Sequence, residues 1–384
     1  MSTRDTAGDI SRRSCLIGLS APLVLPHAVQ AQAAAGKDIL IGRTLPQSGP
    51  MVPVVTGFIE GEVAAIKDAN DRGGIYGRPI KLVFADDAFD GQRALQNAKD
   101  LVEKQGVIAL FGVIGTEPVA ATLPYAAEKR IPMIAAYTGS PALRVKPHPT
   151  FFTTQASYID ELAKIVRTLV TLQSLRIAIA YQDNGFGKLL LPYAQKAITD
   201  QGGTVTGAVA VENSGGNAVA QAKALAALRP NAVILIAAGP SVVAWVKACK
   251  ANIGIPVYTF SLSASVGTVK QLGEDARGLA VARVTPYPWQ GVTPLTREFQ
   301  ESMRRNGNLP VDYDRFLGYI NARVLIEGLR AAGRDPTPQS LVAGMERLGR
   351  LDLGGYALSY SPTNHHGSPY VDITVIGPEG KPMK

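Results

Sequence analysis

The sequence has few of the residues that most often carry catalysis or bind metals. Its 384 residues include only two cysteines and four histidines. Cys15 lies in a segment that we expect to be removed, which leaves Cys249 without an internal disulfide partner. Cys249 lies in an apolar helical pattern and is expected to be a small buried side chain. His365 and His366 lie in a polar loop without a cysteine nearby, so we predict a solvated turn there, and no metal or other cofactor.

The sequence motifs of several common enzyme classes are also missing. No G-x-G-x-x-G dinucleotide fingerprint follows the first predicted strand, and no G-x-x-x-x-G-K-[ST] phosphate loop or H-E-x-x-H metal motif occurs. The G-x-S-x-G turn of serine hydrolases is absent as well. Asp86 and Asp87 are adjacent carboxylates, but they follow a strand and precede Asp90, so helix capping and a solvated loop explain them better than acid–base chemistry. The sequence therefore predicts a protein that is not an enzyme.

Charge and composition are those of a soluble, folded protein. The chain is 46% hydrophobic and 18% charged, and it is long enough for two ordinary domains. The formal net charge is +8, but the longest basic run is Arg304-Arg305 and acidic residues interleave elsewhere. A nucleic-acid-binding surface would cluster lysine and arginine with aromatic residues, so we expect no nucleic-acid partner.

The N-terminal segment has the pattern of an export signal. Arg12 and Arg13 precede an uncharged, largely apolar stretch at residues 14–36, which ends in small residues suited to cleavage. The arginine pair resembles a twin-arginine signal. Pro22 is among the residues that interrupt the apolar stretch before it could span a bilayer. We therefore predict that residues 1–33 are a cleaved signal peptide and that the mature protein is periplasmic.

Beyond this segment, short apolar runs alternate with longer helical patterns. The runs have consecutive β-branched or apolar residues, as in strands buried on both faces of a parallel sheet. Strands are predicted at residues 39–45, 80–85, 107–112, 133–135, 176–180, 204–211, 232–236, 257–260, 279–284 and 371–376. Helices are predicted at residues 58–70, 93–104, 159–171, 188–200, 218–228, 315–332 and 338–348. The alternation predicts an α/β fold with doubly wound sheets.

This alternation is too long for one sheet of ordinary size. We expect the chain to cross between two lobes where the alternation loosens, near residues 153–155, 284–288 and 354–355. The first lobe is predicted to comprise residues 37–154 and 285–352. The second is predicted to comprise residues 155–284 and 353–384.

Several segments, each weak alone, together resemble a known receptor family. They read GGIYGRPI at 73–80, KLVFADD at 81–87, IPMI at 131–134, DNGFG at 183–187 and YSPTNHHG at 360–367. As a set they resemble the leucine/isoleucine/valine-binding proteins of ABC importers, which are type 1 periplasmic binding proteins. The resemblance covers nearly the whole chain after the signal segment.

The resemblance implies both a fold and a function. The family fold has two Rossmann-like lobes joined by three strand crossings, with a small-molecule ligand in the cleft between them. The lobes close on the ligand by a hinge motion, and the closed form meets the membrane permease of an ABC transporter. A ligand sensor of the same fold that signals to a partner protein is the alternative. An enzyme that uses the cleft would need a nucleophile–base pair, and none is apparent in the sequence.

Ligand-binding residues are expected in the loops that follow the strands, since sheets of this kind bind ligands beyond their carboxyl ends. Gln47 and Ser48 follow the first strand. Thr116 matches the family's hydroxyl residue for a ligand carboxylate, and its other interpretation is a plain helix N-cap. Tyr137 and Thr138 lie in a loop that matches the remainder of the family's carboxylate pocket.

The second lobe is expected to contribute Tyr158, Phe186, Ser241 and Ser263. Phe186 matches the family's aromatic position, and its other interpretation is a packed core residue. Amino-acid binders of the family present acids near Ser263 and Tyr158, but here no acid stands near Ser263, and the closest acid to Tyr158 is Asp160, two residues on. A buried ammonium without a counter-charge is unstable by several kcal/mol. We therefore expect a small carboxylate or a branched-chain-amino-acid-like solute, with the deaminated acid preferred.

Overall fold

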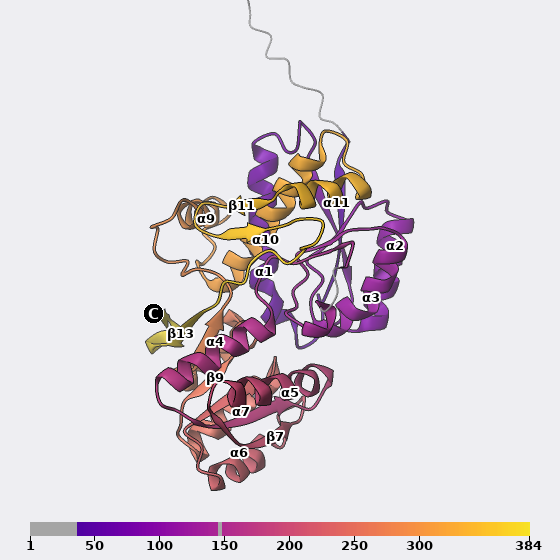
Figure 1. Ribbon diagram of the computed structural model, residues 1–384. Helices are drawn as coiled ribbons and strands as arrows, with labels where there is room; N and C mark the ends of the chain where they lie inside the picture. The colour runs from indigo at the N-terminus through magenta and orange to yellow at the C-terminus, as the bar shows by residue number, and fades with distance from the viewer. Residues whose placement is uncertain (1–36, 145–147) are drawn as a thin grey trace, which may run out of the picture. The chain divides into compact units, whose positions relative to one another are not determined.

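The computed structural model describes residues 37–144 and 148–384 (Figure 1). The predicted signal peptide at residues 1–33 lies outside the described residues. Within the described ranges, no helix is both long enough and apolar enough to cross a membrane.

The first sheet has five parallel strands in the order β2-β1-β3-β4-β5. The strands are β1 (Ile39–Leu45), β2 (Ile80–Asp86), β3 (Leu110–Phe111), β4 (Met133–Ile134) and β5 (Phe151–Phe152). The helices in this part of the chain are α1 (Val52–Asp71), α2 (Gly91–Glu103) and α3 (Thr116–Glu128). β3 is shorter than the predicted strand at both ends, and its end at Phe111 is explained by Gly112, which takes a left-handed backbone with φ of 61°. All these strands point their carboxyl ends to the same edge of the sheet.

The second sheet has seven strands in the order β14-β13-β10-β9-β8-β6-β7. Five are parallel: β6 (Arg176–Gln182), β7 (Thr204–Val211), β8 (Ala232–Ile236), β9 (Val257–Thr259) and β10 (Ala280–Arg283). Two run antiparallel to their neighbours, β13 (Asp372–Ile376) and β14 (Pro382–Met383). The helices are α4 (Tyr158–Thr171), α5 (Gly185–Asp200), α6 (Ala218–Ala227), α7 (Pro240–Asn252) and α8 (Val266–Leu272). Every residue of β8 is buried, as its continuous apolar run predicts.

Between β10 and β13 the chain returns to the first sheet through three helices and a hairpin. They are α9 (Pro294–Arg305), α10 (Tyr313–Ala332), α11 (Pro338–Arg347) and the pair β11 (Arg350–Asp352) and β12 (Ala357–Ser359). The chain therefore passes between the sheets after β5, after β10 and before β13. The exact ranges of the two lobes remain predictions.

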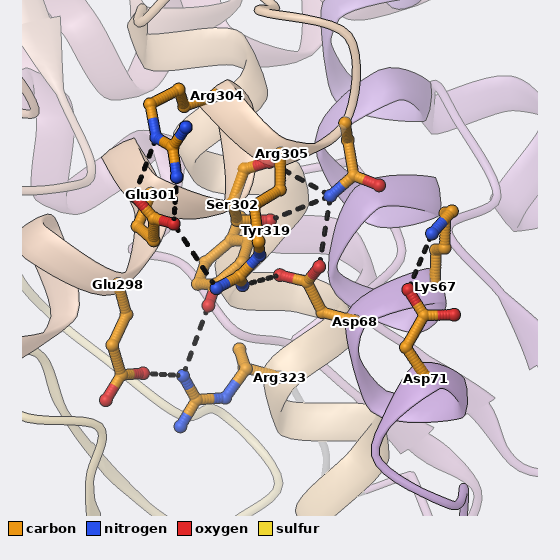
Figure 2. A network of polar contacts seen from close by, with 11 residues as sticks. Lys67, Asp68, Asp71, Glu298, Glu301, Ser302, Arg304, Arg305, Tyr319 and Arg323 are labelled. Carbon is orange, nitrogen blue, oxygen red and sulfur yellow. Dashed lines mark hydrogen bonds and ion pairs between the residues drawn. The ribbon is translucent and has the colours of Figure 1, made fainter.

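Helices α1 and α10 pack with their backbones almost touching (Figure 1). A β-carbon on Gly61 would overlap the carbonyl of Arg315, and one on Gly318 would overlap the carbonyl of Phe58. Glycine is therefore required at both places. A polar network joins α1 to α9 nearby, and Figure 2 shows Asp68 and Arg305 linked in it. Asp68 accepts hydrogen bonds from Arg305 at 2.8 Å and from Asn306 at 3.1 Å.

Candidate functional site

The loops after β3 and β4 bring two threonine hydroxyls together. The Oγ1 atoms of Thr116 and Thr138 lie 3.0 Å apart, and the backbone N–H of Ser140 donates to Thr138 Oγ1 at 3.1 Å. The N-cap of α3 is Gly115, and Thr116 makes no capping hydrogen bond. The interpretation of Thr116 as a helix N-cap is therefore wrong. Its hydroxyl, partly exposed, faces the neighbouring loop.

A buried ion pair fixes the end of β3 below these hydroxyls. Arg43 and Glu62 are both buried, and Arg43 Nη2 lies 2.6 Å from the carboxylate of Glu62. The same guanidinium donates to the carbonyl oxygens of Phe111 at 3.3 Å and Gly112 at 3.5 Å. The pair thereby positions the turn that leads to Thr116.

Tyr158, at the start of α4, meets the loop after β4 from the other side. Its backbone N–H donates to the Gly139 carbonyl at 2.8 Å, and a β-carbon on Gly139 would collide with its ring. The ring of Tyr158 packs edge-on against Phe186 at 5.3 Å and Phe260 at 5.5 Å. Phe186 is only half-buried, so it is not an ordinary core residue. The structure thus brings Thr138, Tyr158 and Phe186 into one neighbourhood.

An acid that the sequence analysis missed lies beside this aromatic group. Glu161 is fully buried, and its carboxyl oxygens accept hydrogen bonds from Ser261 N at 2.7 Å and Ser261 Oγ at 3.1 Å. Burial raises the pKa of Glu161 to about 8, against the opposing effect of these hydrogen bonds. The expectation that no acidic side chain lies in the region around Ser263 is therefore wrong. Glu161 lies three residues after Tyr158 on the apolar face of α4, and this position was the signal in the sequence.

A small cavity lies between α1, α10, the end of β10 and the loops after β4 and β9. We call it the central cavity, and its lining includes Phe58, Tyr137, Ser261, Arg283, Tyr313 and Asp314. Its volume of about 10 Å³ is close to the minimum for one water molecule. A solute could enter only if the lining elements moved apart.

Arg283 and Asp314 are the charged residues of the central cavity, and neither was predicted. Arg283 is only 3% exposed; it donates to Thr374 Oγ1 at 3.2 Å and to the Ala264 carbonyl at 3.4 Å. Asp314 accepts the backbone N–H of Val266 at 2.7 Å. Burial, and then the neighbouring Asp312, raise the pKa of Asp314. The sequence pattern predicted only that Arg283 lies near the end of a strand.

The remaining predicted residues are engaged in hydrogen bonds within the protein. Gln47 N and Ser48 Oγ donate to the carboxylate of Asp86 at 2.8 and 2.6 Å, which together lower the pKa of Asp86 to about 2. Ser241 Oγ donates to the Ala238 carbonyl at 3.0 Å. Ser263 Oγ donates to the Ala237 carbonyl at 2.6 Å, so both serines fix the loop after β8.

The carboxylates after β2 differ in part from expectation. Asp90 caps α2 by accepting the Arg93 N–H at 2.8 Å, which confirms the predicted capping. Asp87, however, is fully buried and accepts hydrogen bonds from Thr44 Oγ1 and Phe89 N, each at 2.9 Å. Asp87 is therefore a structural residue under the loop, not part of a solvated turn.

The histidine pair is likewise not a solvated turn. His365 is 2% exposed, stacks on Phe152 at 3.9 Å, and has its ring nitrogens 2.8 Å from the His148 carbonyl and 3.2 Å from Glu346. In the described ranges, no group of three histidine, cysteine or acidic side chains is arranged to hold a metal ion. Cys249 is buried, as predicted, and burial raises its pKa to about 11.

The chain is similar to known proteins both in sequence and in structure. The sequence model described as periplasmic binding protein matches residues 38–381. Leu/Ile/Val-binding protein homolog 7 of Brucella suis is 24% identical over 198 residues, which is 49% of this chain and 48% of that protein. The match thus spans about half the length of this curated relative.

Solved structures match over most of the chain. An extracellular ligand-binding receptor from Verminephrobacter eiseniae is 29% identical with a TM-score of 0.82, covering 90% of this chain and 100% of that one. An ABC transporter solute-binding protein from R. palustris, in complex with benzoate, has a TM-score of 0.78 at 19% identity, covering 90% and 95% of the two chains. The predicted α/β fold of the type 1 periplasmic binding proteins is confirmed. The chain belongs to the periplasmic binding protein family, as its resemblance to leucine/isoleucine/valine-binding proteins predicted.

Proposed function

We propose that this chain is the substrate-binding component of an ABC importer and holds a small carboxylate or branched-chain-amino-acid-like solute between its two sheets. The observation that carries the proposal is the meeting of the Thr116–Thr138 hydroxyl pair with the aromatic group of Tyr158 and Phe186. Hydroxyls and backbone N–H groups suit a carboxylate. The aromatic rings suit an apolar body.

A carboxylate without an amino group is the ligand class that the charges favour. Glu161 would be the nearest counter-charge for an ammonium, but burial holds its pKa near 8, so it is mostly uncharged at neutral pH. Both of its oxygens already accept hydrogen bonds from Ser261. The similar R. palustris protein holds benzoate, an aromatic carboxylate.

The protein is proposed to act outside the cytoplasm and without chemistry. Its signal peptide would be cleaved within about three residues of Ala33, as small-residue cleavage patterns predict. The solute-loaded protein would then deliver its ligand to a membrane permease. Uptake of the solute by vesicles carrying that permease would separate an importer receptor from a sensor of the same fold.

Calorimetry tests the ligand class directly. Leucine, its keto and hydroxy analogues, and substituted benzoates are titrated into the mature protein. We expect a deaminated or aromatic acid to bind at least about tenfold more tightly than leucine, because an uncompensated buried ammonium is unfavourable by roughly 1–3 kcal/mol. Leucine binding more tightly than all of its deaminated relatives would restore the amino-acid interpretation.

A substitution at Thr116 tests the placement of the ligand. Thr116→Ala removes one of the two paired hydroxyls and should weaken binding of the best acid by about 1 kcal/mol or more. Thr199→Ala is the matched control, since Thr199 is an exposed helical threonine on α5. Equal affinity in the two variants would remove Thr116 from the site.

A further inference from the structure

A groove of about 540 Å³ runs along α8. We call it the α8 groove; its apolar lining includes Val266, Val269, Trp289, Pro310, Val311 and Ile376. It is distinct from the central cavity, which is too small for a solute, but the two share the side chains of Arg283, Tyr313 and Asp314. Those three side chains form the partition between them.

Arg283 is a buried cation at the inner end of the α8 groove. Its polar contacts are neutral, with Thr374 Oγ1 and the Ala264 carbonyl, and its guanidinium stacks 4.3 Å from the ring centre of Tyr313. Among the described residues, no carboxylate lies within 4.0 Å of it. The charges of Asp314 and Glu161 favour its charged form from further away, against the effect of burial. A buried cation without an ion-pair partner is unfavourable, so an anion bound beside it would be stabilised.

The wall beside Arg283 is aromatic. Trp289 packs against Tyr287 at 4.9 Å and Tyr313 at 5.3 Å between ring centres. Val269 and Val311 contribute aliphatic surface to the same groove. Aromatic and aliphatic walls with a few polar groups are typical of sites for small organic molecules.

The acids around the α8 groove are already occupied or lie at its rim. Asp312 forms an ion pair with Arg315, and Asp314 accepts the N–H of Val266. Glu379 pairs with Lys381 at 2.6 Å on the exposed edge. Among these acids, Asp314 acts on Arg283 through its charge, yet the two form no ion pair within 4.0 Å.

From these observations we propose that the α8 groove is a second ligand site, which takes a small organic carboxylate with an apolar body and binds its carboxylate through Arg283. This site goes beyond the proposed function, because it does not use Thr116, Tyr158 or Phe186. A ligand in it would touch α8 and the loop before α10 at once. It would therefore favour the arrangement in which these two segments are close.

Tryptophan fluorescence reports on the α8 groove with little interference. The chain has two tryptophans, and Trp245 is fully buried in the core of the second sheet. In a Trp245→Phe background, Trp289 is the remaining reporter. Benzoate and hexanoate, titrated to millimolar concentration into the mature protein, should change its emission in a saturable way.

Three variants in this background separate the groove from the proposed solute site. Val269→Phe fills the groove and should weaken the Trp289 response at least about tenfold, whereas Val219→Phe, on the exposed face of α6, should leave it unchanged. Thr116→Ala should also leave it unchanged. Arg283→Gln should weaken it by about tenfold to a hundredfold, as expected for the loss of a hydrogen bond to a charged group. Arg283→Lys keeps the charge and shows whether a loss reflects folding, which thermal unfolding also monitors.

Each outcome decides the proposal. A Trp289 response lost in Val269→Phe and kept in Thr116→Ala supports a second site. No response, or a response lost in Thr116→Ala and kept in Val269→Phe, overturns it and leaves the proposed function standing. A single response lost in both variants means one continuous site and also overturns it. Calorimetric binding of a solute that depends on Thr116 tests the proposed function separately.

Discussion

Gly267 packs directly against Pro53: a β-carbon at position 267 would overlap the carbonyl oxygen of Pro53. Gly267 lies in α8 and Pro53 in α1, so this contact joins the helix layers of the two sheets. At the neighbouring position, the backbone N–H of Val266 donates to the Asp314 carboxylate at 2.7 Å, and this hydrogen bond joins α8 to α10 at the same place. The absence of a side chain at residue 267 is what allows the two helices to meet.

Gly267→Ala is expected to weaken solute binding by about tenfold or more. The added methyl group holds α1 and α8 apart, and overpacking of this kind is unfavourable by roughly 1–3 kcal/mol. Because the clash exists only when the helices meet, thermal unfolding should change little. Calorimetry gives the affinity, and Gly291→Ala is the control, since a β-carbon there meets only ordinary contacts from 3.4 Å. Unaltered affinity in Gly267→Ala would show that the junction is not part of the bound form.

Closure on solute should be visible in solution. The central cavity of about 10 Å³ cannot admit a solute unless its walls separate, so the solute-free protein is expected to populate a more open arrangement. Small-angle scattering should give a smaller radius of gyration with saturating solute than without it. The same profile at proven saturation would contradict a hinge motion.

The Arg43–Glu62 pair should be important for stability. Glu62→Gln leaves Arg43 buried without a counter-charge, and we expect the free energy of unfolding to fall by about 3 kcal/mol. Urea unfolding at pH 8 measures this, because burial raises the pKa of Glu62 only to about 7 and the pair is then ionised. Glu298→Gln is the matched control, since that glutamate is 53% exposed and its pair with Arg323 should contribute less than about 1 kcal/mol. Equal losses in both variants would contradict a special role for the buried pair.

Glu161 should make stability depend on pH. Its pKa is raised from 4.5 to about 8 in the folded chain, so between these values the folded state binds more protons than the unfolded state. The free energy of unfolding that this carboxyl contributes therefore falls as pH rises from about 4.5 to about 8. Glu161→Gln mimics the protonated form and should remove that part of the slope.

Chemical denaturation of Glu161→Gln and wild type at several pH values tests this. The variant should gain stability relative to wild type as pH rises. Glu128→Gln, at an exposed carboxylate, is the control and should track wild type. A constant difference between Glu161→Gln and wild type across the range would mean that Glu161 titrates normally.

The sequence was sufficient for elements whose pattern is local. The strand at 232–236 was predicted with the bounds that the structure has, because its apolar run is uninterrupted. The helix α3 was not delimited, since Pro118 and Pro124 interrupt its pattern although the fold tolerates both. The helix α9 was missed altogether; its charged surface hides a buried stripe that includes Phe299 and Met303.

The candidate site was harder to predict where its parts are distant in the chain. Glu161 accepts a hydrogen bond from Ser261, which lies 100 residues further along the chain, and no local sequence pattern links the two. From the sequence, His365 was predicted to be a polar loop residue, but β5 of the first sheet places Phe152 against its ring. Thr116 and Thr138, by contrast, were expected at the same edge of the sheet, because each follows a strand and parallel strands end there. Their hydroxyls do lie together, while their part in ligand binding remains a prediction.

The backbone contact between α1 and α10 also constrains the order in which the protein can be completed. Phe58 and Gly61 come early in synthesis, yet the helix that covers them begins at Tyr313. A nascent chain that has not yet emerged past this helix leaves the face of α1 uncovered. The first sheet and its helices therefore cannot finish folding on the ribosome ahead of the rest, and completion must wait for nearly the whole polypeptide.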